Sequence, residues 1–215
     1  MIKDKNYFTV FICYRRKEDK GAPIGSYLAR ILYEYLKNNN ISAFYDVECL
    51  GFGDDYRKLT KYYIETQVRY FILILTPDIF NRCSNSDDAV FNEIRLAIDK
   101  FNSEDIDDGS VLNKFQFVPI NPDNLFDFNK NLPKSLLPEV SKRISSNNAC
   151  DISFSKKAFK TDISSLIKDI TTKVLSPSAV DKTNKAAYMG KNEIAFIQTD
   201  DSLFSRIMQF FTKTK

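Results

Sequence analysis

The chain has no histidine among its 215 residues. This absence excludes Ser-His-Asp and Cys-His catalysis, histidine general bases and most zinc hydrolases. Any chemistry must therefore depend on carboxylates, arginines, hydroxyls or thiols.

Long apolar runs, a cysteine pattern and a strong net charge are also missing. No window approaches the roughly 18–20 apolar residues of a membrane span, and no apolar core of a secretory signal comes after the charged residues 1–5. The four cysteines have no paired spacing, and a formal charge of +3 is too small to indicate nucleic-acid binding. We therefore expect a cytoplasmic protein with reduced thiols, without a disulfide frame, a metal site, a membrane span or a nucleic-acid partner.

The most informative pattern that is present is the stretch 7–19, YFTVFICYRRKED. Its apolar part has the length of a strand buried on both faces, as in a parallel sheet. The run ends abruptly in charge, which puts Arg15 and Arg16 at the carboxyl end of that strand. Because ligands bind at that edge of open α/β sheets, the stretch predicts a fold class and a site together.

Strand-like and helix-like segments then alternate along the chain. Further strands are expected at 41–46, 69–76, 115–121 and 150–154, with the fourth strand bulged or near an edge because of Pro119. Four helices are expected. The first covers 24–36 and is ended by Asn38–Asn40, and the second begins near Asp54–Asp55. The third begins after Asp87 or Asp88, and the fourth covers 159–174. This alternation predicts a three-layer α/β sandwich with a central parallel five-stranded sheet and helices on both faces.

The pattern changes at Ser176-Pro177-Ser178. Residues 1–175 are therefore expected to form one domain, and residues 176–215 a linker and a short C-terminal extension. The extension contains an amphipathic stretch at 201–211 that either packs on the domain or contacts another copy or a partner.

Glu93 is the candidate catalytic residue. At about 100° per residue it lies on the border of the apolar stripe of its helix, so its carboxylate is partly desolvated. The charge of such a carboxylate needs either a compensating partner or a functional role. The alternative from position alone is an ordinary ion pair with Arg95 or Arg82. In the flavodoxin-like strand order 2-1-3-4-5, however, a crevice opens between the ends of strands one and three, where Glu93 would face the loop Tyr14–Arg16.

The residues of this crevice suit a dinucleotide. Arginine forks match a diphosphate, and a carboxylate matches ribose hydroxyls or a developing oxocarbenium ion. The alternative for Arg15 and Arg16 is a solvated charged loop.

These motifs resemble those of TIR (Toll/interleukin-1 receptor) domains, and bacterial members above all. The segment 11–16, FICYRR, is similar to the first box of the family, and 44–53 to its second strand and BB loop. The segment 72–77 with 88–94 is similar to the third strand and the helix that carries the family's catalytic glutamate, and 117–120 with 132–133 fits the fourth strand and the segment after it. The resemblance covers roughly residues 7–175.

The resemblance implies an NAD glycohydrolase that releases nicotinamide and ADP-ribose, or a cyclic or modified ADP-ribose signal sensed by a downstream effector, in bacterial antiphage defence. NAD+ would be the substrate, without a further cofactor. Glu93 would act on the nicotinamide-side ribose. The substrate-binding residues would be Tyr14, Arg15, Arg16, Phe44, Asp46, Phe80 and Cys83.

The sequence departs from the family pattern at two positions. The first box has Cys13 where relatives carry serine, which weakens a hydrogen bond. The aromatic residue four positions before the catalytic glutamate is Ala89 here, so another aromatic residue, Phe80, Phe91 or Tyr14, would have to stack on substrate.

The resemblance also implies TIR–TIR self-association, with the BB loop, residues 47–56, completing the site of a neighbour. Activity should then rise with assembly. The rival interpretation is a non-enzymatic TIR adaptor that assembles through the same loop. A receiver-like switch is disfavoured, because the first strand ends in arginines and the third in Thr76-Pro77, with Asp78 just beyond.

Overall fold

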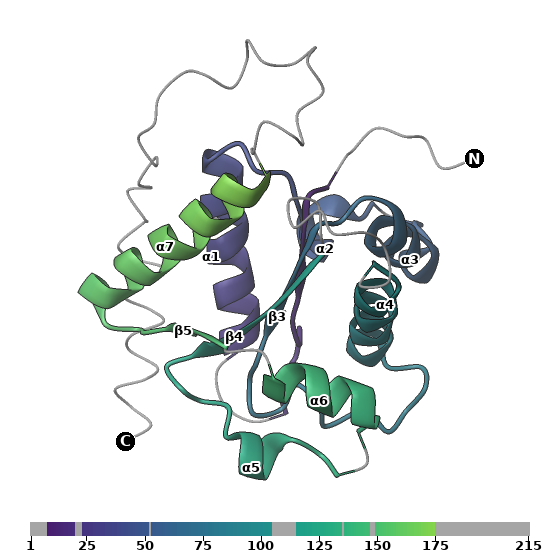
Figure 1. Cartoon of the computed structure of the whole chain (residues 1–215). Coiled ribbons are helices and arrows are strands. Elements are labelled where there is room, and N and C mark those ends of the chain that lie inside the picture. Colours follow the sequence, from purple (N-terminus) through teal and green to yellow (C-terminus); the bar gives the residue numbers. More distant parts are fainter. Residues whose placement is uncertain are drawn as a thin grey trace.

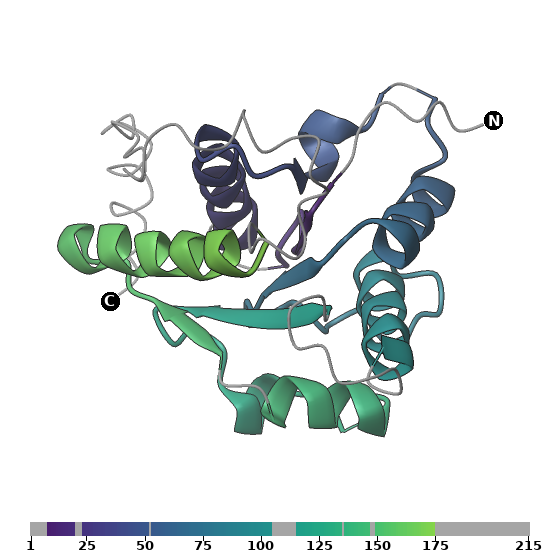
Figure 2. The same ribbon diagram turned by 45° about the horizontal axis from the view of Figure 1, so that its top comes forward.

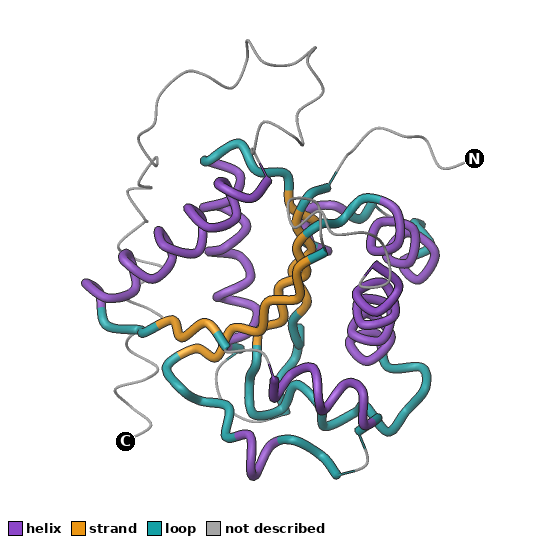
Figure 3. The backbone as a smooth tube through the Cα atoms, in the orientation of Figure 1, coloured by secondary structure: helices purple, strands orange, loops and turns teal. Residues whose placement is uncertain are grey.

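A computed structural model describes residues 8–19, 23–51, 53–104, 115–134, 136–146 and 149–174. Its centre is a sheet of five strands in the order β2-β1-β3-β4-β5, and every neighbouring pair is parallel (Figures 1 and 3). The predicted class and strand order are therefore confirmed. The strands are β1 Val10–Cys13, β2 Ala43–Phe44, β3 Tyr70–Ile74, β4 Gln116–Pro122 and β5 Cys150–Ile152.

Helices cover both faces of the sheet, α1 and α7 on one side and α3 and α4 on the other, with α6 below them (Figures 1 and 2). Three helices, α2, α5 and α6, were not predicted. The helices are α1 Ile24–Asn38, α2 Asp46–Cys49, α3 Tyr56–Thr66, α4 Ala89–Glu104, α5 Phe128–Asn131, α6 Pro138–Ser146 and α7 Lys156–Val174.

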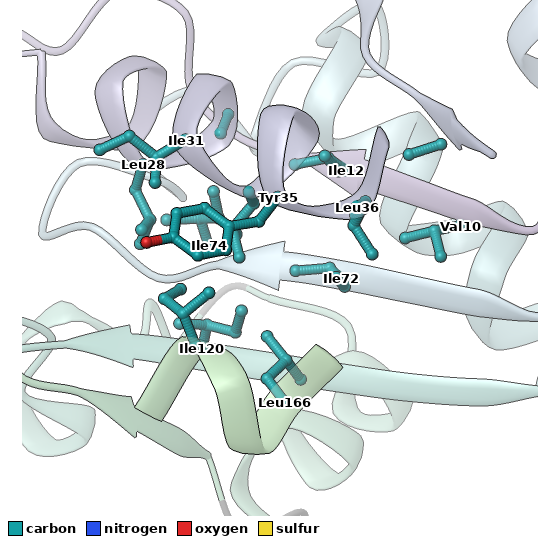
Figure 4. Close-up of a cluster of buried hydrophobic side chains, with 14 of the residues drawn as sticks. Val10, Ile12, Leu28, Ile31, Tyr35, Leu36, Ile72, Ile74, Ile120 and Leu166 are labelled. Atoms are coloured by element: carbon teal, nitrogen blue, oxygen red, sulfur yellow. The ribbon is translucent and has the colours of Figure 1, made fainter. Parts of the chain in front are cut away.

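Two apolar layers hold the helices to the sheet, because alternate strand residues face opposite sides. Val10 and Ile12 of β1 pack with α1 and α7, whereas Phe11 and Cys13 pack with α3, α4 and α6. Figure 4 shows the first layer, with side chains of α1 lying on the strands and Leu166 reaching in from α7. Each fully buried large apolar side chain contributes about 1.5–3 kcal/mol, so the strand ends that bear the site are rigidly placed.

Helix boundaries depend on the residues expected to set them. Asn40 after α1 has a φ of 57°, the left-handed conformation that asparagine tolerates. Asp55 precedes α3, and its side chain accepts a hydrogen bond from the Lys58 backbone N–H at 3.2 Å. These side chains fix where the helices next to the site begin and end.

The strands are shorter than the predicted ranges or shifted from them, and the second strand is shortened most. The second strand was expected to reach Asp46, but β2 ends at Phe44 and Asp46 is the first residue of α2. Pro119 of β4 is opposite Leu73 of β3, and β5 joins β4 only from Ile120 onward. The proline therefore lies in the half of β4 without a second strand neighbour in the described sheet, consistent with the expected position near an edge.

Parts of the expected organisation lie outside the described residues. These are Tyr7 at the start of the first apolar run, Phe52 in the BB loop, and the whole segment 176–215. The division at residue 175 stays a prediction. Among the helices described here, none has the length and apolar character to span a bilayer.

Candidate active site

A cavity of about 330 Å³ lies at the carboxyl end of β1. The segments that come after β2 and β3 and the first two turns of α4 complete its walls, so three neighbouring elements meet there as the topology predicts. The lining residues are Phe11, Ile12, Tyr14, Arg15, Arg16, Lys17, Phe44, Asp46, Tyr56, Arg82, Ala89, Val90 and Glu93.

Glu93 is buried in this cavity, with only 7% of its surface exposed, more than its border position on the helix suggested. Its pKa is raised to about 8: burial is the main cause and the charge of Asp46 adds to it, while the Cys13 thiol and the charges of Arg15 and Arg16 oppose the shift. The alternative was an ordinary ion pair with Arg95 or Arg82. Glu93 forms no ion pair with either one in the described part of the chain, and Arg82 pairs with Asp19 at 2.9 Å.

The Cys13 thiol is the neighbour that most strongly opposes the raised pKa of Glu93. Burial raises the pKa of Cys13 well above its ordinary value, and the neighbouring charge of Glu93 raises it further. Cys13 therefore keeps its proton beside the Glu93 carboxyl group and favours the ionised form of that group. A thiol is a weaker donor than a hydroxyl, so it supports the ionised glutamate less than serine would.

A second polar cluster lies at the cavity wall. Asp46 accepts a hydrogen bond from the Tyr14 hydroxyl at 2.6 Å and a charged hydrogen bond from Arg16 at 2.5 Å. The Arg16 side chain is 58% exposed and that of Asp46 is 19% exposed. Burial, followed by the bond to Asp46, raises the pKa of Tyr14, so the phenol stays protonated. The cluster ties the loop after β1 to the start of α2.

Arg15 has a different environment from the one predicted. It is 5% exposed, and its two terminal nitrogens donate to the Asp88 carboxylate at 2.6 and 3.2 Å and to the Ile79 carbonyl at 2.5 Å. Asp88 in turn accepts from the Phe91 N–H at 2.9 Å and so caps α4. Because breaking so buried a pair costs several kcal/mol, Arg15 is not free to bind a diphosphate and instead positions the start of α4.

Two predicted substrate-binding residues, Phe80 and Cys83, do not line the cavity. Phe80 is 2% exposed and packs edge-to-face on Phe126 at 5.6 Å between ring centroids. The Cys83 thiol is buried and lies 3.9 Å from the Ile79 carbonyl. The turn after β3 folds both side chains into the apolar layer under α4, and their role in substrate binding stays a prediction.

Several lining residues were not predicted from the sequence as site residues. Tyr56 brings an aromatic ring from the first turn of α3, and Lys17 and Arg82 bring positive charge from the loops after β1 and β3. Ala89 was noted only as a departure from the family pattern, and it forms part of the wall. Tyr56 comes directly after the predicted helix start at Asp54–Asp55, which was the available signal.

Within the described ranges, no group of three or more histidine, cysteine, aspartate or glutamate side chains is arranged to hold a metal ion. The polar groups that line the cavity are the buried carboxyl group of Glu93, the partly exposed carboxylate of Asp46, the phenols of Tyr14 and Tyr56, and a set of cations. Such a set can stabilise a cationic transition state and bind an anionic tail.

No protein-family model matches the chain. Among solved structures, the TIR domains of the activated Roq1 resistosome directly recognizing the pathogen effector XopQ superpose with a TM-score of 0.52, over 76% of this chain and 99% of that one, at 14% identity. The chain has the TIR fold. The fold expected from the first-box and BB-loop motifs is thereby confirmed.

One curated protein adds a similarity in sequence. The NAD(+) hydrolase sarm1 of Drosophila melanogaster is 37% identical over 92 residues, which are 41% of this chain and 6% of that protein. This chain thus spans only a small part of that relative's length.

Proposed function

We propose that the chain is an NAD+ glycohydrolase that cleaves the bond between nicotinamide and ribose. The observation that carries the proposal is a single glutamate, Glu93, buried at the wall of a cavity at the carboxyl end of β1. The name of the sarm1 relative, an NAD(+) hydrolase, supports the same chemistry.

The chemistry fits a site without histidine. Nicotinamide leaves as a neutral ring from a cationic one, so the leaving group needs no general acid. The ribose passes through an oxocarbenium-like state, which a nearby carboxylate stabilises electrostatically. Glu93 acts in its ionised form, and the positive nicotinamide ring of the substrate favours that form when it binds.

The cavity is large enough for only part of a dinucleotide. Its volume of about 330 Å³ lies at the lower end of the usual range for ligand sites. We assign it to the nicotinamide riboside half, with Tyr14, Phe44 and Tyr56 as walls. Arg16, the exposed arginine of the loop, is then the member of the predicted arginine pair that reaches the diphosphate, by exchanging its bond to Asp46.

Self-association would supply the remaining walls. The TIR fold is found in a resistosome, and Val47, the first residue of the segment assigned to the BB loop, is 54% exposed. We therefore expect the specific activity to rise with protein concentration or crowding. A rate strictly proportional to enzyme concentration over a wide dilution range would contradict this expectation.

The site geometry does not distinguish a linear from a cyclic product, because hydrolysis and cyclisation differ only in the nucleophile that reaches the same ribose carbon. A cyclic or modified ADP-ribose signal and a bacterial antiphage role stay predictions from the family resemblance. So does the alternative function, an adaptor that uses the exposed BB-loop region as an interface without turnover.

The test is incubation of the purified chain with NAD+, with products separated by chromatography. Glu93→Gln keeps the shape of the side chain and removes its charge, and Glu139→Gln on the exposed face of α6 is the matched control. We expect nicotinamide release by the wild type and the control and not by Glu93→Gln. Equal background from all three proteins, also under crowding, would reject the enzyme in favour of the adaptor.

A further inference from the structure

Four basic side chains line the cavity, and three of them already have a carboxylate partner. Arg15 forms an ion pair with Asp88 at 2.6 Å, and Arg16 forms one with Asp46 at 2.5 Å. Arg82 bonds Asp19 at 2.9 Å. Each of these three guanidinium charges is thus already compensated within the protein, so an incoming anion competes with an internal carboxylate for it.

Lys17 is the fourth, and among the described residues its ammonium group forms no ion pair or hydrogen bond. Its side chain is exposed. The backbone on either side is held, since the Arg16 carbonyl accepts from the Ser26 hydroxyl at 2.9 Å and the Asp19 N–H donates to Asp78 at 2.9 Å. The loop therefore holds the backbone of Lys17 in place, while its ammonium group has no bonding partner among the described residues.

We propose that Lys17 binds the diphosphate of the dinucleotide substrate and is the first cation of the site to do so. The inference rests on the proposed function for the identity of the ligand. Lys17 needs no exchange of partners, and a compact ammonium with three donors accepts a phosphate oxygen from many directions. Arg16 joins afterwards, when the phosphate replaces Asp46 as its anion.

The charges of substrate and site agree with this division. NAD+ carries a positive nicotinamide ring at one end and a negative diphosphate in the middle. The cavity offers the carboxyl group of Glu93 in its buried part and the free ammonium of Lys17 on its exposed loop. The substrate would thus be held with its cationic end inward and its anionic middle toward the opening.

The experiment compares Lys17→Met, Lys17→Arg and the control Lys168→Met, an exposed lysine on α7 on the other side of the sheet. Binding of ADP-ribose to the full chain is measured by titration calorimetry at low and at physiological salt. We expect Lys17→Met to weaken binding about five- to tenfold at low salt, and less at physiological salt because the contact is screened. Lys17→Arg should keep most of the affinity, and Lys168→Met all of it.

ADP-ribose binding does not depend on turnover, so the outcome is separate from that of the proposed function. If the chain does not cleave NAD+ but Lys17→Met still lowers its affinity for ADP-ribose, the anion site at Lys17 is supported and the proposed enzymatic function is rejected. Equal affinity of Lys17→Met and wild type, or no ADP-ribose binding by the wild type, would overturn the proposal. In an active enzyme, kcat/KM should fall for NAD+ and not for nicotinamide riboside, which has no phosphate; an equal fall for both would also overturn it.

Discussion

Replacing Glu93 with glutamine should stabilise the protein at neutral and alkaline pH. Glu93 is 7% exposed, and burial raises its pKa from 4.5 to about 8. The folded state therefore favours the protonated carboxyl group, and this contribution to stability is fully present below pH 4.5. It is lost as the pH rises through 8, because ionisation inside the fold is unfavourable. Glutamine has no such ionisation.

The size of the effect can be worked out from the two pKa values. Each pH unit between them costs the wild type about 1.4 kcal/mol relative to a neutral side chain. Between pH 5 and pH 8, the free energy of unfolding of the wild type should fall relative to Glu93→Gln by on the order of 3 kcal/mol. That is a large part of the stability of an ordinary domain.

The assay is chemical unfolding of both proteins at several pH values from 5 to 8. The chain has no tryptophan, so far-ultraviolet circular dichroism is the suitable signal. The difference between the two proteins isolates Glu93, because the other titrating groups are the same in both. Glu139→Gln, at an exposed position of α6, is the control for the substitution itself.

Two results would refute the reasoning. A difference that is constant from pH 5 to 8 would mean that Glu93 titrates like an exposed carboxyl group. A wild type that gains stability over Glu93→Gln as the pH rises would mean that a cation compensates the carboxylate in the folded state.

Three further substitutions test the surroundings of Glu93. Cys13→Ser gives Glu93 a stronger donor, so the pKa of Glu93 and the midpoint of the pH–activity profile should fall by about half to one unit; an upward shift would contradict the contact. Asp46→Asn removes a charge that raises the pKa of Glu93, so the midpoint of the pH–activity profile should fall. It also releases Arg16, so KM for NAD+ should decrease about threefold. An increased KM would assign Asp46 to substrate binding. Asp88→Asn leaves its buried guanidinium partner without a counter-charge and should lower the free energy of unfolding by about 3 kcal/mol in chemical denaturation; a loss below about 1 kcal/mol would show the pair to be dispensable.

Much of the fold could be predicted from local pattern. The continuous apolar run before Arg15 predicted a buried parallel strand, and β1 is fully buried. Asn40, Asp55 and Asp88 act at helix ends in the way their side-chain chemistry predicts. The start of α2 at Asp46 was missed, because a helix of four residues without a buried side chain has no apolar period to detect.

The candidate site was predicted only in part, since a charge pattern does not show which partner a side chain finds. The sequence placed two arginines at the end of β1, and the fold gives them opposite roles. Arg15 is buried and binds Asp88, 73 positions away in the chain, whereas the Arg16 side chain is exposed. Phe80 and Cys83 are in the loop expected to reach the crevice, but the turn after β3 buries them.

The most direct test of the central claim is the initial rate of nicotinamide release from NAD+ between pH 6 and 9, for wild type and Glu93→Gln. With Glu93 active in its ionised form and a pKa of about 8, the wild-type kcat/KM should rise with pH and level off above about pH 8. Glu93→Gln should stay at the buffer background throughout. A Glu93→Gln rate close to that of the wild type across this range would contradict the account.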